Sequence, residues 1–572
     1  MFRLNQKHQQ LPMFGTVSLL RDDHQTLLDE GWAGAFYREL FCRLDEQPFA
    51  VLYSEAASRP NMPVNVLVGL EVLKAGFGWS DSEMYEAFTF NLQVRYALGY
   101  RDVSEGYLDI RTVYYFRQRL AEHMQTTGKN LLAQAFAQIT DAQIKTLAIK
   151  TGRLRMDSTF IASNICDMSR LHLLVAVLLR VYQMLTPADR AGFDPDFAVY
   201  RKGSAHQYVY RVKGEEGAQH MQHIGDLMLR LLNDLATAYK HDATYQMLER
   251  VFHEHFVAEK DTRLRLKQGK ELSADSLQSP DDPDASFRRK RGKEYTGYAV
   301  NVTETCDPDN PLQLIVQMQT QPNVVDDPTL LTNDLPALTE RYDVNEMNTD
   351  GGYNNAQTAA LLRAAKIKHI QTALRGHEAT GVSLSAFAID SADDGVPTTV
   401  RCPQGQTTLF RHTTKDRYAA DFAALRCAVC PLVALCPAEA RKRRPVHVLQ
   451  VDVHDVEIAH RRQQIVENKA AGRNLRVAIE STIGTLKHPY PDDQLPVRGL
   501  GRVTDMMLAS GLMVNVRRLW RYMTAKREQE AEASQATETA TTSSNPVVSL
   551  SRFLTRLLSG IRNLCRRPEL AL

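Results

Sequence analysis

The sequence has few cysteines and no marked excess of charge of either sign. Its 572 residues include only eight cysteines, and 69 Lys and Arg residues are balanced by 67 Asp and Glu residues, for a formal net charge of +2. With 44% hydrophobic and 24% charged residues, the composition is that of an ordinary globular protein. A collagen-like repeat, a disulfide-rich scaffold and disorder throughout the chain are therefore excluded, and the length suits about three or four domains.

A long hydrophobic run is also lacking. The most apolar stretch, Leu171 to Leu185, is shorter than the roughly 20 residues that a membrane span needs, and it contains His172, Arg180 and Gln183. The N-terminal residues MFRLNQKHQQLPMF do not form the continuous apolar segment of a secretory signal. We therefore expect a cytoplasmic chain without membrane contact, whose cysteines are thiols or metal ligands.

Periodicity divides the chain into helical and strand-forming parts. Apolar residues recur at three- and four-residue spacing over 18–132, which predicts an all-helical domain, and Ser80 with Glu83 forms the S-x-x-E pattern of a helix capping box. From residue 144 the pattern alternates, and we expect a strand that ends at Asp157. Later strand-like segments alternate with helical ones, which predicts an α/β core. Those segments are residues 295–305, 312–321 and 344–353.

Two insertions and a polar tail are expected around this core. Residues 164–285 show helical patterns followed by a loop rich in Ser, Asp and Pro, which indicates a helical insertion with a flexible return. After Arg527 apolar residues become scarce, which predicts a disordered linker before a basic amphipathic tail. The predicted domains are a helical N-terminal domain (1–140), the core (141–163 and 286–525), the helical insertion (164–285), a small Cys-rich insertion (380–445) and the tail (526–572).

Three acidic residues are candidates for a metal site. Asp157 ends a predicted strand, Asp350 ends another before two glycines that allow a sharp turn, and Glu480 lies in the predicted helix RNLRVAIESTIGTLKH. Magnesium takes oxygen ligands, and two such ions can activate an attacking oxygen and stabilise a leaving oxygen of a phosphodiester. Each acid taken alone has an ordinary alternative, because a strand-end Asp is usually a turn residue.

The helix around Glu480 also carries basic residues. Arg473, Arg476, Glu480 and Lys487 are expected within about 60° on one helical face. Such a face suits a DNA backbone, since Arg and Lys neutralise phosphates. It also suits a solvated helix with an Arg476 to Glu480 pair at i,i+4. Only the ordered combination of the three acids with these basic residues favours the catalytic interpretation.

In this combination the chain resembles the DDE transposases of bacterial insertion sequences. Their signature includes Y-x2-R-x3-E-x6-K, which Arg476, Glu480 and Lys487 match, whereas Arg473 stands where many relatives carry Tyr. MDST and TDGGY fit the first and second catalytic aspartates, and FRRKRGKEYTGYAVNV resembles the strand region between them. The segments SEAASRPNMPVNVLVGLEVL and GWSDSEMYEAF resemble the helical domain that precedes the core. The resemblance covers roughly residues 15–525.

The resemblance implies an RNase H-like mixed-sheet core and a defined reaction. Asp157, Asp350 and Glu480 would hold two Mg²⁺ or Mn²⁺ ions, and Arg473, Arg476 and Lys487 would bind DNA. By this resemblance, water would cleave a DNA strand at the terminal inverted repeats of the insertion sequence, and the freed 3′-hydroxyl would then attack target DNA. The resemblance also implies a nucleoid-associated protein that works as a homodimer on paired ends. The alternatives are a DNA-binding protein derived from a transposase and an RNase H-like nuclease without strand transfer.

Cysteines and basic runs give two further expectations. Cys402, Cys427, Cys430 and Cys436 could close a structural four-thiolate Zn²⁺ site, or they could be reduced cysteines in a small packed subdomain. Three basic runs are expected to face DNA, since they accompany one carboxylate site. These runs are residues 288–293, residues 441–444, and the set Arg517, Arg518 and Arg521.

Overall fold

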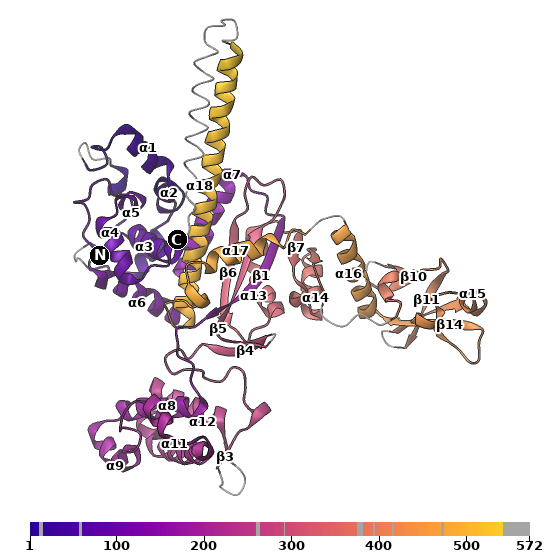
Figure 1. The fold of residues 1–572 in the computed structure, drawn as a ribbon, viewed down its shortest axis with the longest axis horizontal. Helices are drawn as coiled ribbons and strands as arrows, with labels where there is room; N and C mark the ends of the chain where they lie inside the picture. Colours follow the sequence, from indigo (N-terminus) through magenta and orange to yellow (C-terminus); the bar gives the residue numbers. More distant parts are fainter. Residues whose placement is uncertain are drawn as a thin grey trace.

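A mixed six-stranded sheet lies at the centre of the protein (Figure 1). Its strands are β1 (Arg153–Ala162), β4 (Ser286–Lys290), β5 (Lys293–Thr305), β6 (Ile315–Pro322), β7 (Glu346–Thr349) and β8 (Lys368–Gln371). Their order is β4-β5-β1-β7-β8, and β6 also pairs with β5. β1 is antiparallel to β5 but parallel to β7, which is parallel to β8. The predicted α/β class with a mixed sheet is confirmed.

The computed structural model describes most of the chain. The described ranges are residues 1–10, 15–56, 60–258, 264–290, 292–374, 381–392, 395–414, 417–470 and 474–541. No helix within these ranges is both long enough and apolar enough to cross a membrane.

The N-terminal region is helical, as predicted. Its helices are α1 (Asp22–Glu30), α2 (Trp32–Phe36), α3 (Val64–Phe77), α4 (Asp81–Phe90), α5 (Leu92–Ala97), α6 (Ile110–Thr127) and α7 (Leu131–Leu147), with the short 3₁₀ helices η1 (Lys7–Gln9) and η3 (Gln47–Leu52) and the π-helix η2 (Tyr37–Phe41). The predicted capping box starts α4, because Glu83 N donates to Ser80 Oγ at 3.2 Å and Ser80 N donates to Glu83 Oε2 at 2.7 Å. Both contacts satisfy amides that a helix start leaves unpaired.

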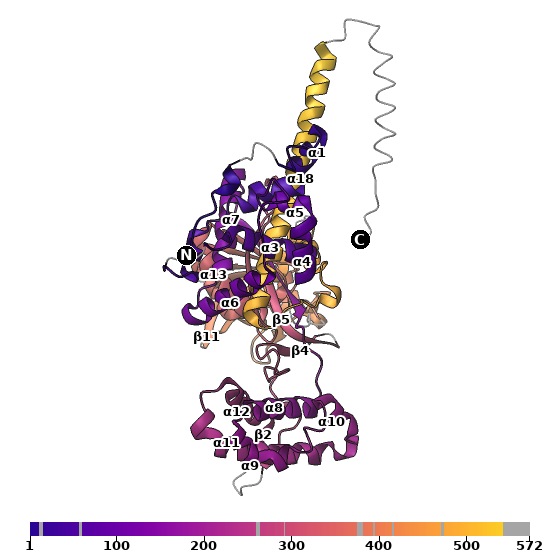
Figure 2. The ribbon, with the colours of Figure 1, turned by 90° about the vertical axis from the view of Figure 1, so that its left-hand side faces the viewer.

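The N-terminal helices share one hydrophobic core with the sheet and with α18 (Leu500–Thr541). The helices α3 and α18 pack so closely that a Cβ at Gly76 would lie 2.2 Å from Met513 Cγ. Beyond this contact α18 continues to Thr541, rising above the other elements in Figures 1 and 2. Disorder over 526–541 is thus the wrong prediction, because that segment is rich in Ala, Glu and Gln, which favour helix without burial.

Both faces of the sheet are covered by helices. On one face, Leu154 and Met156 of β1 share a core with α13 (Asp327–Arg341) and α14 (Ala356–Ala364). On the other, Ile161 of β1 and Ile479 of α17 (Ala478–Lys487) belong to the core that includes α18. The alternation of side chains along β1 separates these two sets. Short turns complete this region: η6 (Gly351–Tyr353) and η9 (Pro491–Asp493).

The first core strand begins later than predicted and does not end at Asp157. α7 extends to Leu147, and β1 runs from Arg153 to Ala162. The reason is its antiparallel pairing with β5, which continues past Asp157 until Ala162 lies opposite Gly297. A pairing partner some 140 positions away decides this strand's length, so the local pattern could not show it.

The helical insertion has a hydrophobic core of its own. Figures 1 and 2 show it below the central sheet. Its elements are α8 (Arg170–Met184), α9 (Pro187–Phe197), α10 (Ala205–Arg211), η4 (Gly214–Glu216), α11 (Gly217–Tyr239), α12 (Ala243–His255), the hairpin β2 (Phe256–Ala258) with β3 (Leu264–Leu266), and η5 (Gly269–Glu271). The return segment is irregular but packed, since Asp282 is fully buried and accepts the Tyr298 hydroxyl of β5 at 2.5 Å.

The Cys-rich insertion forms a second six-stranded sheet, which extends from the side of the core in Figure 1. Its elements are η7 (Leu384–Ala386), β9 (Ala388–Ser391), β10 (Pro397–Arg401), β11 (Thr407–Thr414), β12 (Arg417–Ala423), α15 (Ala424–Ala428), η8 (Val433–Leu435), β13 (Glu439–Ala440) and β14 (Val446–Asp452). α16 (Val453–Ala470) leads from this sheet back to the core.

Candidate active site

Two carboxylates lie just beyond the paired stretch of two parallel strands. β1 pairs with β7 as far as Arg155, which lies opposite Asn348. Asp157 follows Arg155 by two positions and Asp350 follows Asn348 by two positions, so both lie at the sheet edge beyond the last β1–β7 pair. Asp157 is buried and Asp350 is half-buried. The sequence pattern predicts that Asp350 ends a strand; β7 ends one residue earlier, at Thr349, and Asp350 directly follows it.

A turn after β7 holds Asp350. Its Oδ1 accepts a hydrogen bond from Gly352 N at 2.6 Å and so caps η6. The chain passes close to the backbone after β8, because a Cβ at Gly351 would lie 2.2 Å from a carbonyl oxygen there. The fully buried Tyr353 then donates to Asn301 Oδ1 of β5 at 2.7 Å. Backbone and side-chain contacts therefore fix the turn that carries Asp350.

Arg476 joins Asp157 to Glu480. Its Nη2 donates to Asp157 Oδ2 at 2.6 Å, and its Nη1 lies 3.3 Å from Glu480 Oε1. The Arg476 side chain is 17% exposed and that of Glu480 is 59% exposed. The guanidinium is thus enclosed, while the third carboxylate reaches solvent.

All three acids interact electrostatically with the guanidinium of Arg476. Burial raises the pKa of Asp157 above its ordinary value; Arg476 opposes this shift, and the charge of Asp350 adds to it. Burial disfavours the charged form of Arg476, but Asp157, Asp350 and Glu480 together raise the pKa of its guanidinium. The structure therefore brings the three predicted carboxylates into one electrostatic group, which a single guanidinium balances only in part.

Helix α17 starts later than the sequence pattern predicts. It begins at Ala478, and Arg476 lies in the turn before it. The Leu475 carbonyl, which a longer helix would use internally, instead accepts a hydrogen bond from Arg155 Nη1 at 2.8 Å. The prediction of one shared helical face is therefore wrong for Arg476, which reaches its two carboxylates from a turn.

Lys487, at the end of α17, lies over β1. Its Nζ is 3.3 Å from Thr159 Oγ1, two positions along the strand from Asp157, and 2.5 Å from Asp493 Oδ2. Arg473, the fourth basic or acidic residue of the predicted face, lies outside the described residues.

Two arginines of the third basic run point inward. Arg517 donates to the Gly76 carbonyl and Arg518 to Glu304 Oε2, each at 2.7 Å. The prediction that they face DNA is wrong, because both satisfy buried acceptors at the junction of α18 with other elements. Glu304 is a residue that the sequence reasoning missed, although an acid within the apolar strand 295–305 is a signal that could have found it.

The four clustered cysteines line one small cavity in the Cys-rich insertion: Cys402, Cys427, Cys430 and Cys436. The Sγ of Cys402 accepts a hydrogen bond from Gln406 N at 3.3 Å. Burial raises the pKa of the Cys427 thiol; a hydrogen bond from Gln406 opposes this, and the other three cysteines add to it. The structure therefore gathers all four predicted residues, each as a free thiol.

Neither cluster is a ready-made metal site. Within the described ranges, no group of three or more His, Cys, Asp or Glu side chains is spaced to hold a metal ion. At the carboxylates, Arg476 stands between Asp157 and Glu480, so a cation needs this guanidinium to move. The donors nevertheless fit in kind, because carboxylate oxygens suit Mg²⁺ and the buried charge of Asp157 needs compensation. Four thiols likewise suit Zn²⁺.

Comparison with known proteins gives two family matches. Residues 401–520 match a transposase DDE domain, and residues 25–119 match a transposase domain (DUF772). The first match includes Glu480 and the four cysteines but neither Asp157 nor Asp350. No curated protein and no solved structure matches the chain. The chain thus carries a transposase DDE domain and a DUF772 transposase domain, a pair typical of insertion-sequence transposases.

Proposed function

We propose that this transposase cleaves the ends of an insertion sequence by metal-dependent phosphodiester hydrolysis and joins the 3′ ends to target DNA. Asp157, Asp350 and Glu480 are the proposed centre for both steps. The observation that carries the proposal is the shared contact of Arg476 with Asp157 and Glu480, beside the strand edge where Asp350 lies. Three segments far apart in the sequence thereby supply acids to one place.

The proposed centre would bind two divalent cations, Mg²⁺ or Mn²⁺, through its carboxylates. Such ions neutralise charge on the attacking and leaving oxygens of an in-line displacement. Asp157 and Asp350 are held by their strands and turns, whereas the exposed Glu480 side chain would complete the ligand set once its ion pair with Arg476 opens.

Arg476 is the group that we propose the divalent cations displace from the carboxylates. In the DNA-free protein its guanidinium compensates the buried charge of Asp157. Its Nε is buried and has no hydrogen-bond partner among the described residues, so this conformation leaves one donor unsatisfied. We propose that Arg476 turns to a DNA phosphate when cations bind, and that Lys487 leaves Asp493 to contact the terminal DNA.

Three finer assignments belong to the same proposal. We assign the central sheet to the RNase H-like class, on the strength of its mixed strand order and the placement of Asp157 and Asp350. We assign a homodimer to the working complex, because two element ends must be held together. We assign structural Zn²⁺ to the cysteine cluster, because its thiols line one cavity and Gln406 N already donates to a sulfur.

One assay distinguishes this function from the two alternatives. Purified full-length protein is incubated with Mg²⁺, a labelled DNA fragment from the sequence that flanks its gene, and a supercoiled target plasmid. Cutting followed by joining of the label to the plasmid is the expected result. Cutting alone indicates a nuclease without strand transfer, and binding without cutting indicates a DNA-binding protein derived from a transposase. Either of these outcomes overturns the proposal.

A further inference from the structure

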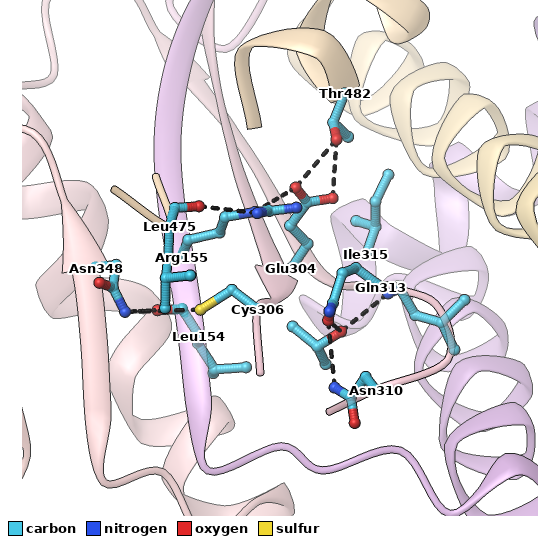
Figure 3. Close-up of polar contacts among 12 residues, drawn as sticks. Leu154, Arg155, Glu304, Cys306, Asn310, Gln313, Ile315, Asn348, Leu475 and Thr482 are labelled. Carbon is cyan, nitrogen blue, oxygen red and sulfur yellow. Dashed lines mark hydrogen bonds and ion pairs between the residues drawn. The ribbon is translucent and has the colours of Figure 1, made fainter. Parts of the chain in front are cut away.

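A buried charge network lies next to the proposed centre but contains none of its three acids. Glu304 of β5 is fully buried and accepts hydrogen bonds from two arginines. Arg155 Nε lies 2.6 Å from its Oε1, and Arg518 Nη1 lies 2.7 Å from its Oε2. Figure 3 shows Glu304 and Arg155 between the strands and the helical segments. One carboxylate thus connects β1, β5 and α18.

The network also holds α17 at two points. Before the helix, the Leu475 carbonyl accepts from Arg155 Nη1 at 2.8 Å. Within the helix, Thr482 Oγ1 lies 3.0 and 2.9 Å from the two carboxylate oxygens of Glu304 (Figure 3). These two points flank Arg476 and Glu480, which contact each other at 3.3 Å. The segment that carries the third acid is therefore attached to the sheet on either side of that acid.

The same network is attached to the strand of the first acid. Arg155 precedes Asp157 by two positions on β1, and alternate residues of a strand project from the same face. Arg155 lies directly opposite Glu304 in the register of β1 and β5. A second connection between Asp157 and Glu480, besides the direct one through Arg476, accordingly runs through Arg155, Glu304 and Thr482.

Stability alone is a weak reason for such a network. Desolvation of buried charges offsets much of their attraction, and apolar residues of similar volume often stabilise a fold equally well. What charged hydrogen bonds add is direction, because a guanidinium presents its donors in a fixed planar arrangement. Mg²⁺ in turn demands near-ideal octahedral geometry at about 2.0–2.1 Å. The spacing of Asp157 and Glu480 must therefore be set with little tolerance.

We propose that Glu304 is a positioning residue that fixes the register of α17 on β1 through Arg155 and Thr482. In this role it sets the spacing of Asp157 and Glu480 that divalent cations require. The inference rests on the proposed function, since it concerns the same cation site. Glu304 itself is fully buried and is not expected to contact DNA or cations.

The most selective test removes one hydroxyl from α17. Thr482→Val keeps the size of the side chain but loses its contact with Glu304, whereas Thr482→Ser keeps the hydroxyl. Thr485→Val is the matched control, because Thr485 lies exposed on the same helix and donates to the Ser481 carbonyl of its own helix at 2.9 Å. Mn²⁺ affinity is measured on the full-length, DNA-free protein from the electron paramagnetic resonance signal of the free ion.

Thr482→Val should weaken Mn²⁺ binding about tenfold, as loss of a residue that orients a metal ligand does. Thr482→Ser and Thr485→Val should bind Mn²⁺ like the wild type. Thr482→Val should also need a higher Mg²⁺ concentration for half-maximal cleavage, whereas Thr482→Ser and Thr485→Val should not. Binding of end DNA should stay unchanged in all three variants. Wild-type Mn²⁺ affinity and cleavage in Thr482→Val would overturn the inference.

A second variant tests Glu304 itself. Glu304→Gln keeps the shape but presents an amide donor to one of the arginines, and it should weaken Mn²⁺ binding by tenfold or more. Glu46→Gln is its control, since Glu46 is a buried acid of the N-terminal helical region that accepts from Val64 N at 2.8 Å. This control should lose stability without a change in Mn²⁺ affinity.

Failure of the proposed function has a different signature. In that case the wild type does not cleave DNA with Mg²⁺, and Asp157→Asn binds Mn²⁺ as tightly as the wild type. Both proposals are then overturned together. If the wild type binds and cleaves but Thr482→Val and Glu304→Gln match it, only the positioning inference is overturned.

Discussion

Arg476 Nη2 donates to Asp157 Oδ2 at 2.6 Å across 319 positions of sequence. The pair links the turn before α17 to β1, and it places a positive charge where the proposed function needs cations. Because the Asp157 and Arg476 side chains are only 10% and 17% exposed, solvent does little to compensate either charge if the other is removed. Removal of Arg476 should therefore make folding stability depend on divalent cations, and this dependence can be measured.

Arg476→Ala should destabilise the protein by about 3 kcal/mol without divalent cations, because it leaves the buried Asp157 carboxylate unpaired. Millimolar Mg²⁺ should restore much of this loss, since a bound ligand stabilises the folded state and the competing guanidinium is gone. Thermal unfolding with and without Mg²⁺ measures both effects. Arg38→Ala, which breaks an exposed 2.7 Å pair with Asp29, should cost less than about 1 kcal/mol and show no Mg²⁺ rescue. Equal Mg²⁺ responses in the two variants would contradict the cation site.

Local sequence patterns were sufficient for some parts of this structure. The Ser80 to Glu83 capping box involves two residues within one helical turn, so its hydrogen bonds follow from the spacing alone. Asp350 could be placed at the end of a strand because the two glycines that follow it favour a sharp turn, and η6 begins there. The four cysteines could be grouped because three of them share a short segment.

Other parts depend on contacts between distant segments and could not be predicted. Leu475 lies outside α17 because its carbonyl is taken by Arg155, some 320 positions away. Arg518 resembles a surface cation in sequence, and only the packing of α18 against β5 reveals its buried partner Glu304. The extent of β1 beyond Asp157 likewise depends on its pairing with β5.

Asp505 of α18 should make folding stability fall as the pH rises through about 6. Burial raises its pKa to about 6; a hydrogen bond from Asn130 Nδ2 at 2.7 Å opposes the shift, and Glu71 adds to it. Between about pH 4 and 6 the folded state keeps a proton that the unfolded state has lost, so the stability present below pH 4 is lost above 6.

Asp505→Asn stays neutral and can still accept the hydrogen bond from Asn130. Relative to the wild type, it should gain on the order of 1–3 kcal/mol between pH 4 and pH 8. Urea unfolding across this range measures the gain, and Asp226→Asn, at an exposed position on α11, should show none. Parallel curves for wild type and Asp505→Asn would contradict the assigned burial of this carboxyl.

Lys487→Ala should weaken binding of end DNA and reduce the slope of log affinity against log salt by about 1, the value for one lost phosphate contact. Lys150→Ala is a close control, because Lys150 forms an ion pair with Asp309 at 2.5 Å, as Lys487 does with Asp493. A salt titration of fluorescently labelled DNA measures both slopes. The assignment of Lys487 to the DNA interface fails if the two variants give the same slope.

The cysteine cluster should hold one Zn²⁺ per chain in protein purified without a histidine tag. Cys430→Ser should remove the metal and lower the stability of the Cys-rich sheet, because a structural site contributes its binding energy to folding. Elemental analysis gives the stoichiometry. A value near zero in the wild type would identify the four residues as reduced cysteines of a packed subdomain.

The central claim is that Asp157, Asp350 and Glu480 form one cation-dependent centre for DNA strand cleavage. The most direct test is cleavage of labelled end DNA by Asp157→Asn in Mg²⁺, with end binding measured on the same preparation. The account predicts that cleavage is abolished while binding of the ends stays at the wild-type level. Cleavage at the wild-type rate by the folded variant would remove Asp157 from the centre and contradict the account.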